Sequence, residues 1–388
     1  MKWLRSMSRP RIGLVDGGGA GACNVHAVRA ARLNDVAARG APDRGETADG
    51  RRRRARMSRC SVLRARRTQP RAAALAAAFL LTRAAAAQSP AGAADGAAIA
   101  ERAYRLAPFD SLEAGPRREV MRGGTRDDYE RARADRRFAL RKVEYGSDGL
   151  RVVAYVYGPA SPAPARPAIV YARGSFVAGD LAPALLLTLH RLADAGYVVV
   201  APQYRGSDGG EGRDEMGGAD VADVRNAVVL ARTTPGVDTG RVFLYGESRG
   251  GMMTYQALRD GAAVRAAAVV GAFTDLDSLL AGDPRSRQAA ATVWPRFADE
   301  RASIVPRRSA AHWPDSLRRA PLLILHGGAD RQVSPRQALR LAIALDAAGA
   351  PYELHVLAGG SHTLAERAAE RDTLVVAWFR RHAPSSRQ

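Results

Sequence analysis

The chain has 388 residues, of which 46% are hydrophobic and 25% are charged, with 38 Gly, 21 Pro and two Cys. This composition excludes a collagen-like or wholly disordered chain, and two cysteines cannot build a disulfide scaffold. The formal net charge of +20 is uneven, because residues 1–88 hold 19 basic and 5 acidic residues and residues 89–388 hold 40 and 34. The modest excess in the longer segment, without a basic helix carrying interleaved aromatic residues, argues against a nucleic-acid partner.

The first 87 residues do not have the pattern of a folded domain. Residues 1–56 show no sustained apolar period, and we expect a disordered segment or an over-extended translation upstream of a true start at Met57. In residues 57–87, arginines precede the apolar run Ala72–Leu81, and the small residues Ala85–Ala87 follow. This layout predicts a secretory signal peptide cleaved near Ala87, and therefore a periplasmic or secreted protein without a stable membrane anchor. An Ala-rich surface helix is the alternative interpretation.

The rest of the chain alternates short strands with helices. Residues 88–138 are expected to be a linker or helical preface, and residues 139–388 the catalytic domain. A hairpin is predicted from Ala139–Tyr145 and Leu150–Tyr157 around a Gly-Ser-Asp-Gly turn. Further strands are predicted at Pro167–Ala172, Tyr197–Pro202, Arg241–Tyr245, Ala266–Val270, Leu322–Leu325 and Tyr352–Leu357. Helices are predicted at Ala182–Ala195, Ala219–Thr233, Gly251–Asp260, Pro335–Ala348 and Leu364–His382.

Continuous apolar strands flanked by helices indicate a sheet covered on both faces. We therefore expect an α/β fold with a mainly parallel, doubly wound sheet and an N-terminal hairpin. Active sites of such sheets lie at the carboxyl ends of the strands, so the loops after each strand are where catalytic residues are expected.

A nucleophile motif follows the strand predicted at Arg241–Tyr245. It is Gly246–Gly251, Gly-Glu-Ser-Arg-Gly-Gly, and a helical stretch comes next. Glycines flank a serine in this way where the turn from strand to helix is too sharp for side chains, which makes Ser248 the candidate nucleophile. The alternative interpretation is an ordinary helix N-cap serine.

A serine nucleophile needs a base and an acid that orients the base, in the chain order Ser, acid, His. Asp330 lies in the loop after the strand predicted at Leu322–Leu325, and His362 lies in a glycine-lined loop after the last predicted strand. Both positions satisfy that order. A solvated turn carboxylate and a loop imidazole without a role are the alternatives.

An oxyanion hole needs backbone amides near the nucleophile. The residue after the nucleophile, Arg249, is one candidate donor. The loop Arg173–Phe176 after another strand supplies Gly174 and Ser175 as further candidates, although a plain strand-to-helix turn explains the same residues.

These motifs together resemble the prolyl oligopeptidase family of serine peptidases, within the α/β-hydrolase superfamily. The resemblance covers residues 140 to 385 and includes Tyr204–Ser207, Asp220 with Asp223, and Pro321–Asp330. The spacing of the three candidate triad residues is similar to that of acylaminoacyl peptidases. The resemblance implies a Ser-Asp-His triad, an acyl-enzyme and no metal or other cofactor.

Two features depart from that family. Arg173–Phe176 reads Arg-Gly-Ser-Phe where the family commonly has His-Gly-Gly-Pro, which affects the second oxyanion donor. The stretch between the predicted signal peptide and the hairpin is too short for the β-propeller that limits substrate size in many family peptidases. Substrate size selection must then come from another element or be absent.

The sequence leaves the substrate open. Phe176, Phe273 and Trp294 are candidate residues of a substrate pocket, and packing against the domain is the alternative interpretation of these aromatic residues. Three arginines, Arg173, Arg205 and Arg249, offer positive charge near the site unless they are solvated on the surface. We expect hydrolysis of small peptides or aminoacyl substrates; a carboxylic-ester hydrolase, with an ester substrate, and a non-catalytic binding relative are the alternatives.

Overall fold

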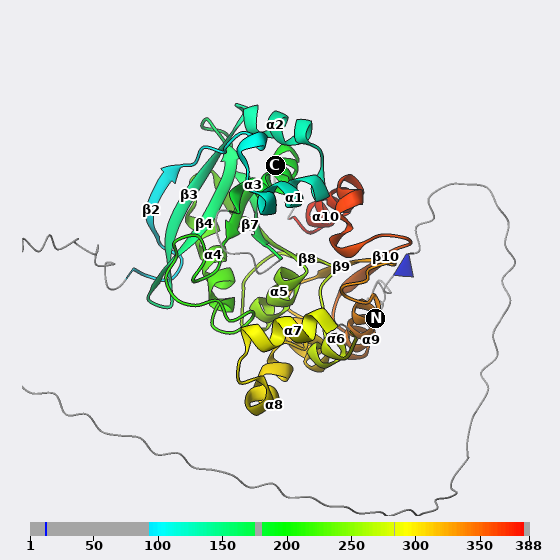
Figure 1. Cartoon of the computed structure of the whole chain (residues 1–388). Helices are drawn as coiled ribbons and strands as arrows, with labels where there is room; N and C mark the ends of the chain where they lie inside the picture. Colours follow the sequence, from blue (N-terminus) through cyan, green and yellow to red (C-terminus); the bar gives the residue numbers. More distant parts are fainter. Residues whose placement is uncertain (1–11, 14–92, 175–180, 283, 384–388) are drawn as a thin grey trace, which may run out of the picture. The chain divides into compact units, whose positions relative to one another are not determined.

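The computed structural model describes residues 12–13, 93–174, 181–282 and 284–383 (Figure 1). The predicted signal peptide and almost all of the predicted N-terminal extension lie outside the described residues. So do Ser175 and Phe176. In the described part of the chain, no helix combines the length and the apolar character needed to cross a membrane.

One ten-stranded sheet runs through the described part of the molecule. Its strands in spatial order are β1-β10-β9-β8-β7-β5-β6-β4-β3-β2. Their bounds are β1 Ile12–Gly13, β2 Ala98–Ala103, β3 Phe138–Ser147, β4 Leu150–Pro159, β5 Arg166–Ala172, β6 Val198–Pro202, β7 Val237–Glu247, β8 Ala267–Val270, β9 Leu322–Gly327 and β10 Tyr352–Leu357. Strands β5 to β10 are mutually parallel, and β4, β3 and β2 continue the sheet in antiparallel pairs. The expectation of a mainly parallel sheet is confirmed.

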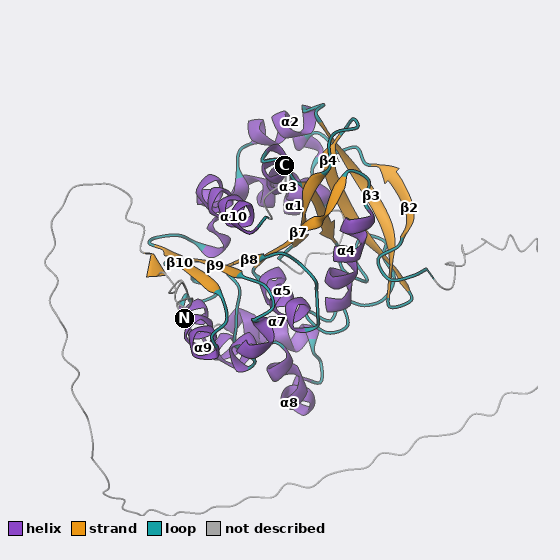
Figure 2. Cartoon of the chain, turned by 180° about the vertical axis from the view of Figure 1, so that it is seen from behind, coloured by secondary structure: helices purple, strands orange, loops and turns teal. Residues whose placement is uncertain are grey.

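Helices cover both faces of this sheet (Figures 1 and 2). Their bounds are α1 Ala114–Gly123, α2 Arg126–Ala134, α3 Ala182–Asp194, α4 Val221–Thr233, α5 Arg249–Arg259, α6 Leu276–Gly282, α7 Pro284–Val293, α8 Phe297–Arg307, α9 Arg336–Ala348 and α10 Ala368–His382, with 3-10 turns η1 Phe109–Ser111, η2 Ala310–His312, η3 Pro314–Leu317 and η4 His362–Arg367. One hydrophobic cluster joins the sheet to α4, α5 and α9, and a second joins it to α1, α2, α3 and α10. The apolar strands are therefore buried on both sides, as predicted for a doubly wound α/β sheet.

The hairpin β3–β4 forms where the Gly-Ser-Asp-Gly turn predicts it. Its two loop residues, Asp148 and Gly149, have φ of 51° and 76°. A two-residue hairpin loop with positive φ at both positions matches the right-handed twist of the strands, and Asp-Gly is a preferred pair for it. The two strands remain paired over their whole length, from Phe138↔Pro159 to Ser147↔Leu150.

Residues 93–137 are more than a linker. Strand β2 extends the sheet by pairing with β3, and α1 and α2 pack against α3. Helix α2 begins with a capping box, in which Thr125 and Asp128 each bond the other's backbone amide. The sequence predicts helix α2 but not strand β2. This strand is almost fully exposed, and its sequence has no alternating apolar pattern.

The chain changes direction across the sheet at β5. Strand β6 lies on one side of β5, and the next strand, β7, lies on the other side. Ligands of open α/β sheets bind at the carboxyl ends of the strands that flank such a switch point. Strand β5 leads to Gly174 and β7 leads to Ser248. The predicted oxyanion loop and the predicted nucleophile therefore both lie at this switch point.

Candidate active site

Ser248 occupies a strained turn between β7 and α5. Its φ and ψ are 53° and −119°, a combination that non-glycine residues rarely adopt. The flanking residues must be glycines because the turn has no room for a Cβ atom at either position. A Cβ at Gly250 would lie 1.9 Å from the carbonyl oxygen of Ala172, and one at Gly246 would lie 2.4 Å from the carbonyl oxygen of Gly250. The strand-turn-helix context therefore presents the serine hydroxyl at the edge of the sheet.

The structure brings Ser248, His362 and Asp330 into one hydrogen-bonded chain. Nε2 of His362 lies 2.9 Å from Oγ of Ser248, and Nδ1 of His362 lies 2.7 Å from Oδ2 of Asp330. An ionised carboxylate only accepts, so Nδ1 carries the proton and Nε2 is free to accept the serine proton. The three residues come from three separate loops, and their arrangement is that of a nucleophile, a base and an orienting acid.

Asp330 accepts hydrogen bonds from two backbone amides and from His362, and Nε2 of His326 lies 3.3 Å from its Oδ2. Its Oδ1 accepts the amides of Gln332 and Val333 at 2.8 and 2.9 Å, and its side chain is fully buried. Burial by itself raises the pKa of Asp330, but hydrogen bonds from His326 and His362 outweigh it and hold that pKa well below its usual range. The carboxylate is therefore ionised at neutral pH.

The loop that carries His362 is tied to the nucleophile turn by Arg371. Its Nη1 donates to the carbonyl oxygen of Thr363 at 3.1 Å and lies 2.9 Å from Oε1 of Glu247. Thr363 and Leu364 have φ of 58° and 55°, so the single helix predicted from Leu364 is wrong in its first turn. The chain instead makes η4 and starts α10 at Ala368, because a left-handed backbone cannot continue an α-helix.

The predicted oxyanion donors lie on two sides of Ser248. Arg249 is the first residue of α5, and the first amides of a helix have no carbonyl partner within it. Gly174 approaches the nucleophile closely, since a Cβ there would lie 3.2 Å from Cβ of Ser248. Ser175, the other candidate, lies outside the described residues, so its role stays a prediction.

Gly174→Ala should reduce catalysis while leaving the fold intact. The added methyl group would lie 3.1 Å from the carbonyl oxygen of Glu247 and press on Ser248, so the two turns must move apart. We expect kcat to fall by roughly 10- to 100-fold, as for a misaligned reacting group. Steady-state kinetics measures this, with Gly115→Ala as the control because nothing lies within 4 Å of a Cβ at that position. Wild-type kcat in the Gly174 variant would argue against an oxyanion loop at this place.

Arg173 and Arg249 are buried, which contradicts the interpretation as solvated surface residues. Their guanidinium carbons lie 4.8 and 4.6 Å from the ring centroid of Tyr204, whose hydroxyl donates to the carbonyl oxygen of Arg173 at 2.7 Å. Arg249 also lies 2.5 Å from Oδ1 of Asp214 and 2.8 Å from Oδ2 of Asp220. Both arginines therefore connect the oxyanion loop and the nucleophile turn to the residues after β6.

Arg205 is likewise buried rather than solvated. Its Nη2 lies 2.7 Å from Oδ1 of Asp223, and its backbone amide donates to the other carboxylate oxygen at the same distance. This pair explains why the motif Tyr204–Ser207 and Asp223 occur together. It anchors the residues after β6 to α4 and so keeps Tyr204 in place beside the site.

A cleft of about 920 Å³ opens in front of the triad. Phe273 lines it, as predicted from the sequence. Trp294 is not among the described residues that line it, because its indole N–H donates to the carbonyl oxygen of Glu215 and its ring packs in the core. Helix α1 contributes Glu119 and Arg122 to the lining, which the sequence does not predict because nothing in the α1 sequence indicates what the helix faces.

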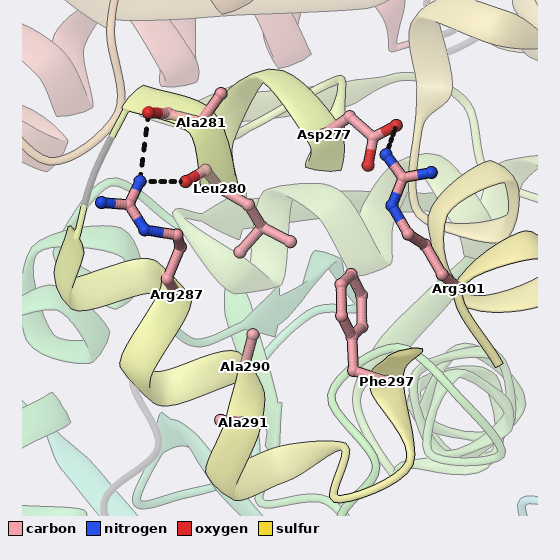
Figure 3. Close-up of a pocket in the computed structure, with 8 residues that line it drawn as sticks. All are labelled: Asp277, Leu280, Ala281, Arg287, Ala290, Ala291, Phe297 and Arg301. Atoms are coloured by element: carbon pink, nitrogen blue, oxygen red, sulfur yellow. Dashed lines mark hydrogen bonds and ion pairs between the residues drawn. The ribbon is translucent and has the colours of Figure 1, made fainter. Parts of the chain in front are cut away.

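A second cavity, of about 390 Å³, lies among α6, α7 and α8 (Figure 3). Arg287 and Arg301 lie on opposite sides of its apolar residues, which include Leu280 and Phe297. Arg301 pairs with Asp277 at 2.7 Å, and Arg287 donates to the carbonyl oxygen of Leu280 at the same distance. The triad does not line this cavity, so the chemistry belongs to the larger cleft.

Comparison with known proteins identifies the family. A model described as the prolyl oligopeptidase family matches residues 184–386, just over half of the chain, and includes all three triad positions. The chain belongs to the prolyl oligopeptidase family. The resemblance inferred from the motifs is thereby confirmed, and the chain is a serine peptidase or hydrolase.

Three proteins show the range of peptidases and esterases to which this family member is similar. An uncharacterized peptidase of Bacillus subtilis, YtmA, is 31% identical over 200 residues, which are 50% of this chain and 75% of YtmA. A puromycin-hydrolyzing peptidase of Mycobacterium tuberculosis has 25% identity and a TM-score of 0.54, covering 63% of this chain. Carboxyl esterase 2 of the fungus Tuber melanosporum has 18% identity and a TM-score of 0.52, covering 65% of this chain and 88% of its own.

The chain matches only part of the puromycin-hydrolyzing peptidase. The similarity spans 39% of the length of the puromycin-hydrolyzing peptidase. The likeness to the esterase shows a shared fold.

Proposed function

We propose that this enzyme hydrolyses amide bonds of small peptides or aminoacyl compounds through Ser248, His362 and Asp330. The observation that supports this best is the hydrogen-bonded chain from Oγ of Ser248 through His362 to Asp330, at 2.9 and 2.7 Å. A serine, an imidazole and a buried carboxylate in this order perform acyl transfer.

The reaction proceeds in two halves. His362 Nε2 takes the proton of Ser248 as Oγ attacks the substrate carbonyl, and Asp330 stabilises the imidazolium that forms. The amides of Arg249 and Gly174 face the oxyanion. The imidazolium then protonates the leaving amine, which departs and leaves an acyl-enzyme. Water attacks the ester carbon with His362 as base, and Ser248 is released with its proton.

The walls of the cleft favour small substrates. Its walls come from α1, α3 and the loops after the strands, and α1 contributes Glu119 and Arg122 to them. These two side chains form an ion pair at 2.9 Å, half in solvent. We propose that this helix limits substrate length, a role that the family resemblance assigns to a β-propeller in many larger peptidases.

An ester substrate is the second candidate. Apolar side chains, among them Leu181, Leu185 and Phe273, line the same cleft and suit an acyl chain. The triad attacks amide and ester carbonyls by the same steps, so the acyl donor is a separate question from the mechanism.

The signal-peptide pattern in residues 57–87 supports a further proposal, that the enzyme acts in the periplasm or outside the cell. We also propose small peptides or esters as its substrates, and the modest charge of residues 89–388 argues against a nucleic-acid partner.

A fluorophosphonate probe followed by a substrate panel tests the proposed function. We expect the probe to label Ser248, as mapped by peptide mass spectrometry, and aminoacyl and peptidyl p-nitroanilides and puromycin to be hydrolysed. Labelling with turnover of p-nitrophenyl esters alone would favour the esterase. A folded protein that neither labels nor turns over any member of the panel would contradict both.

A further inference from the structure

His326 makes a second imidazole contact with the triad carboxylate. It is a residue of β9, it is fully buried, and its Nε2 lies 3.3 Å from Oδ2 of Asp330. This is the oxygen that also accepts from His362 at 2.7 Å. The two imidazoles therefore share one carboxylate oxygen, the second from inside the fold and the first from the cleft.

The protonation of His326 follows from its partners. Nε2 also lies 2.8 Å from the carbonyl oxygen of Val333, and a carbonyl and a carboxylate both only accept. Nε2 must then carry the proton. Nδ1 is buried and has no hydrogen-bond partner in the described part of the chain, which suits an unprotonated ring nitrogen. His326 thus presents a fixed N–H toward Val333 and Asp330.

We propose that His326 is a positioning residue that sets the strength of the Asp330–His362 hydrogen bond. Its N–H draws Oδ2 of Asp330 away from His362 and takes up part of the negative charge that the catalytic imidazolium sees. Without it, the Asp330–His362 hydrogen bond tightens and pulls the imidazole away from Oγ of Ser248. This inference rests on the proposed catalytic roles of Asp330 and His362.

Other charged groups near the histidine loop are the same in every variant considered. Glu366 accepts from the backbone amide and hydroxyl of Ser361, and Arg371 donates to the carbonyl oxygen of Thr363. Their effects on His362 cancel when a His326 variant is compared with the wild type.

Three variants of the full chain separate positioning from packing. His326→Leu removes the N–H but keeps the bulk. His326→Gln places an amide N–H where Nε2 lies, and His326→Asn withdraws its shorter amide from Asp330. The control is His355→Leu on the neighbouring strand β10, where His355 pairs in register with Leu325 and contacts Glu353 instead of the triad.

We expect kcat of His326→Leu to fall by roughly 10- to 100-fold with little change in KM. The acid limb of its kcat/KM profile should move to higher pH by roughly half a unit, because the full charge of Asp330 becomes available to the imidazolium. His326→Gln should recover most of the activity and the wild-type limb, and His355→Leu should match the wild type.

Wild-type kcat and an unshifted acid limb in His326→Leu would overturn the proposal. If that variant does not fold, the same two results in folded His326→Asn would overturn it.

A readout without turnover separates this inference from the proposed function. The downfield proton resonance of the His362 Nδ1–H, assigned by its loss in His362→Gln, should move further downfield in His326→Leu. A moved resonance in an enzyme inactive on every substrate would contradict the proposed function and support the positioning role. An unmoved resonance in an active enzyme would contradict only the positioning role.

Discussion

Ser248→Ala should abolish turnover while the protein remains folded. Removing the nucleophile of a serine hydrolase typically costs roughly 10⁴- to 10⁶-fold in kcat, since only the oxyanion donors and binding remain. The side chain of alanine is smaller than that of serine, so it fits the strained turn at this position without a clash. Steady-state kinetics, fluorophosphonate labelling and the thermal melting temperature together measure the effect.

The control for this variant is Ser303→Ala. Ser303 lies on the exposed side of α8 and donates only to the carbonyl oxygen of Glu300, so its loss should leave both activity and labelling unchanged. Turnover of Ser248→Ala within tenfold of the wild type would contradict the assignment of the nucleophile, and mapping the labelled residue would then show which side chain reacts.

Asp223→Ala should be the most destabilising of the substitutions considered. The Asp223 carboxylate is fully buried and accepts from the backbone and guanidinium of Arg205 and from the hydroxyl of Ser147. Removing Asp223 leaves the buried guanidinium of Arg205 with only the half-exposed Asp148 as an ion-pair partner, and breaking such a buried pair costs roughly 3–5 kcal/mol. For a domain of this size the melting temperature should fall by about 10 °C in thermal unfolding.

Two comparisons isolate the buried charge as the cause. Asp315→Ala removes an exposed pair with Arg318 and should leave the melting temperature unchanged. The double variant Asp223→Leu with Arg205→Met replaces both charges by apolar groups and should recover much of the loss. A single Asp223 variant as stable as the wild type would mean that the Arg205–Asp223 pair contributes little to the fold.

The positions of the triad could be predicted because local patterns determine them. The glycines around Ser248 indicate a turn that has no room for a Cβ atom. The apolar strands before Asp330 and His362 place both residues at the same edge of a parallel sheet. The strand order then brings the three loops together without further information. The same patterns predicted most strands and helices within a few residues of their observed bounds.

The environment of the site depends on contacts between distant parts of the chain. Arg371 of α10 contacts Glu247 at the end of β7 only because these two elements, far apart in sequence, pack together. Whether an arginine is solvated or buried is decided by its partner, and no pattern in the sequence around Arg173 reveals Gln203 or Tyr204.

The sequence by itself determined the α/β class, the family and the three candidate catalytic residues. These properties depend on periodicity and on backbone conformations that only certain residues adopt. Only the tertiary structure decided that Phe273 lines the cleft and Trp294 lies in the core, and that α1 lines the cleft as well. Burial and side-chain partners are properties of the packed chain, because each depends on atoms that lie far apart in sequence.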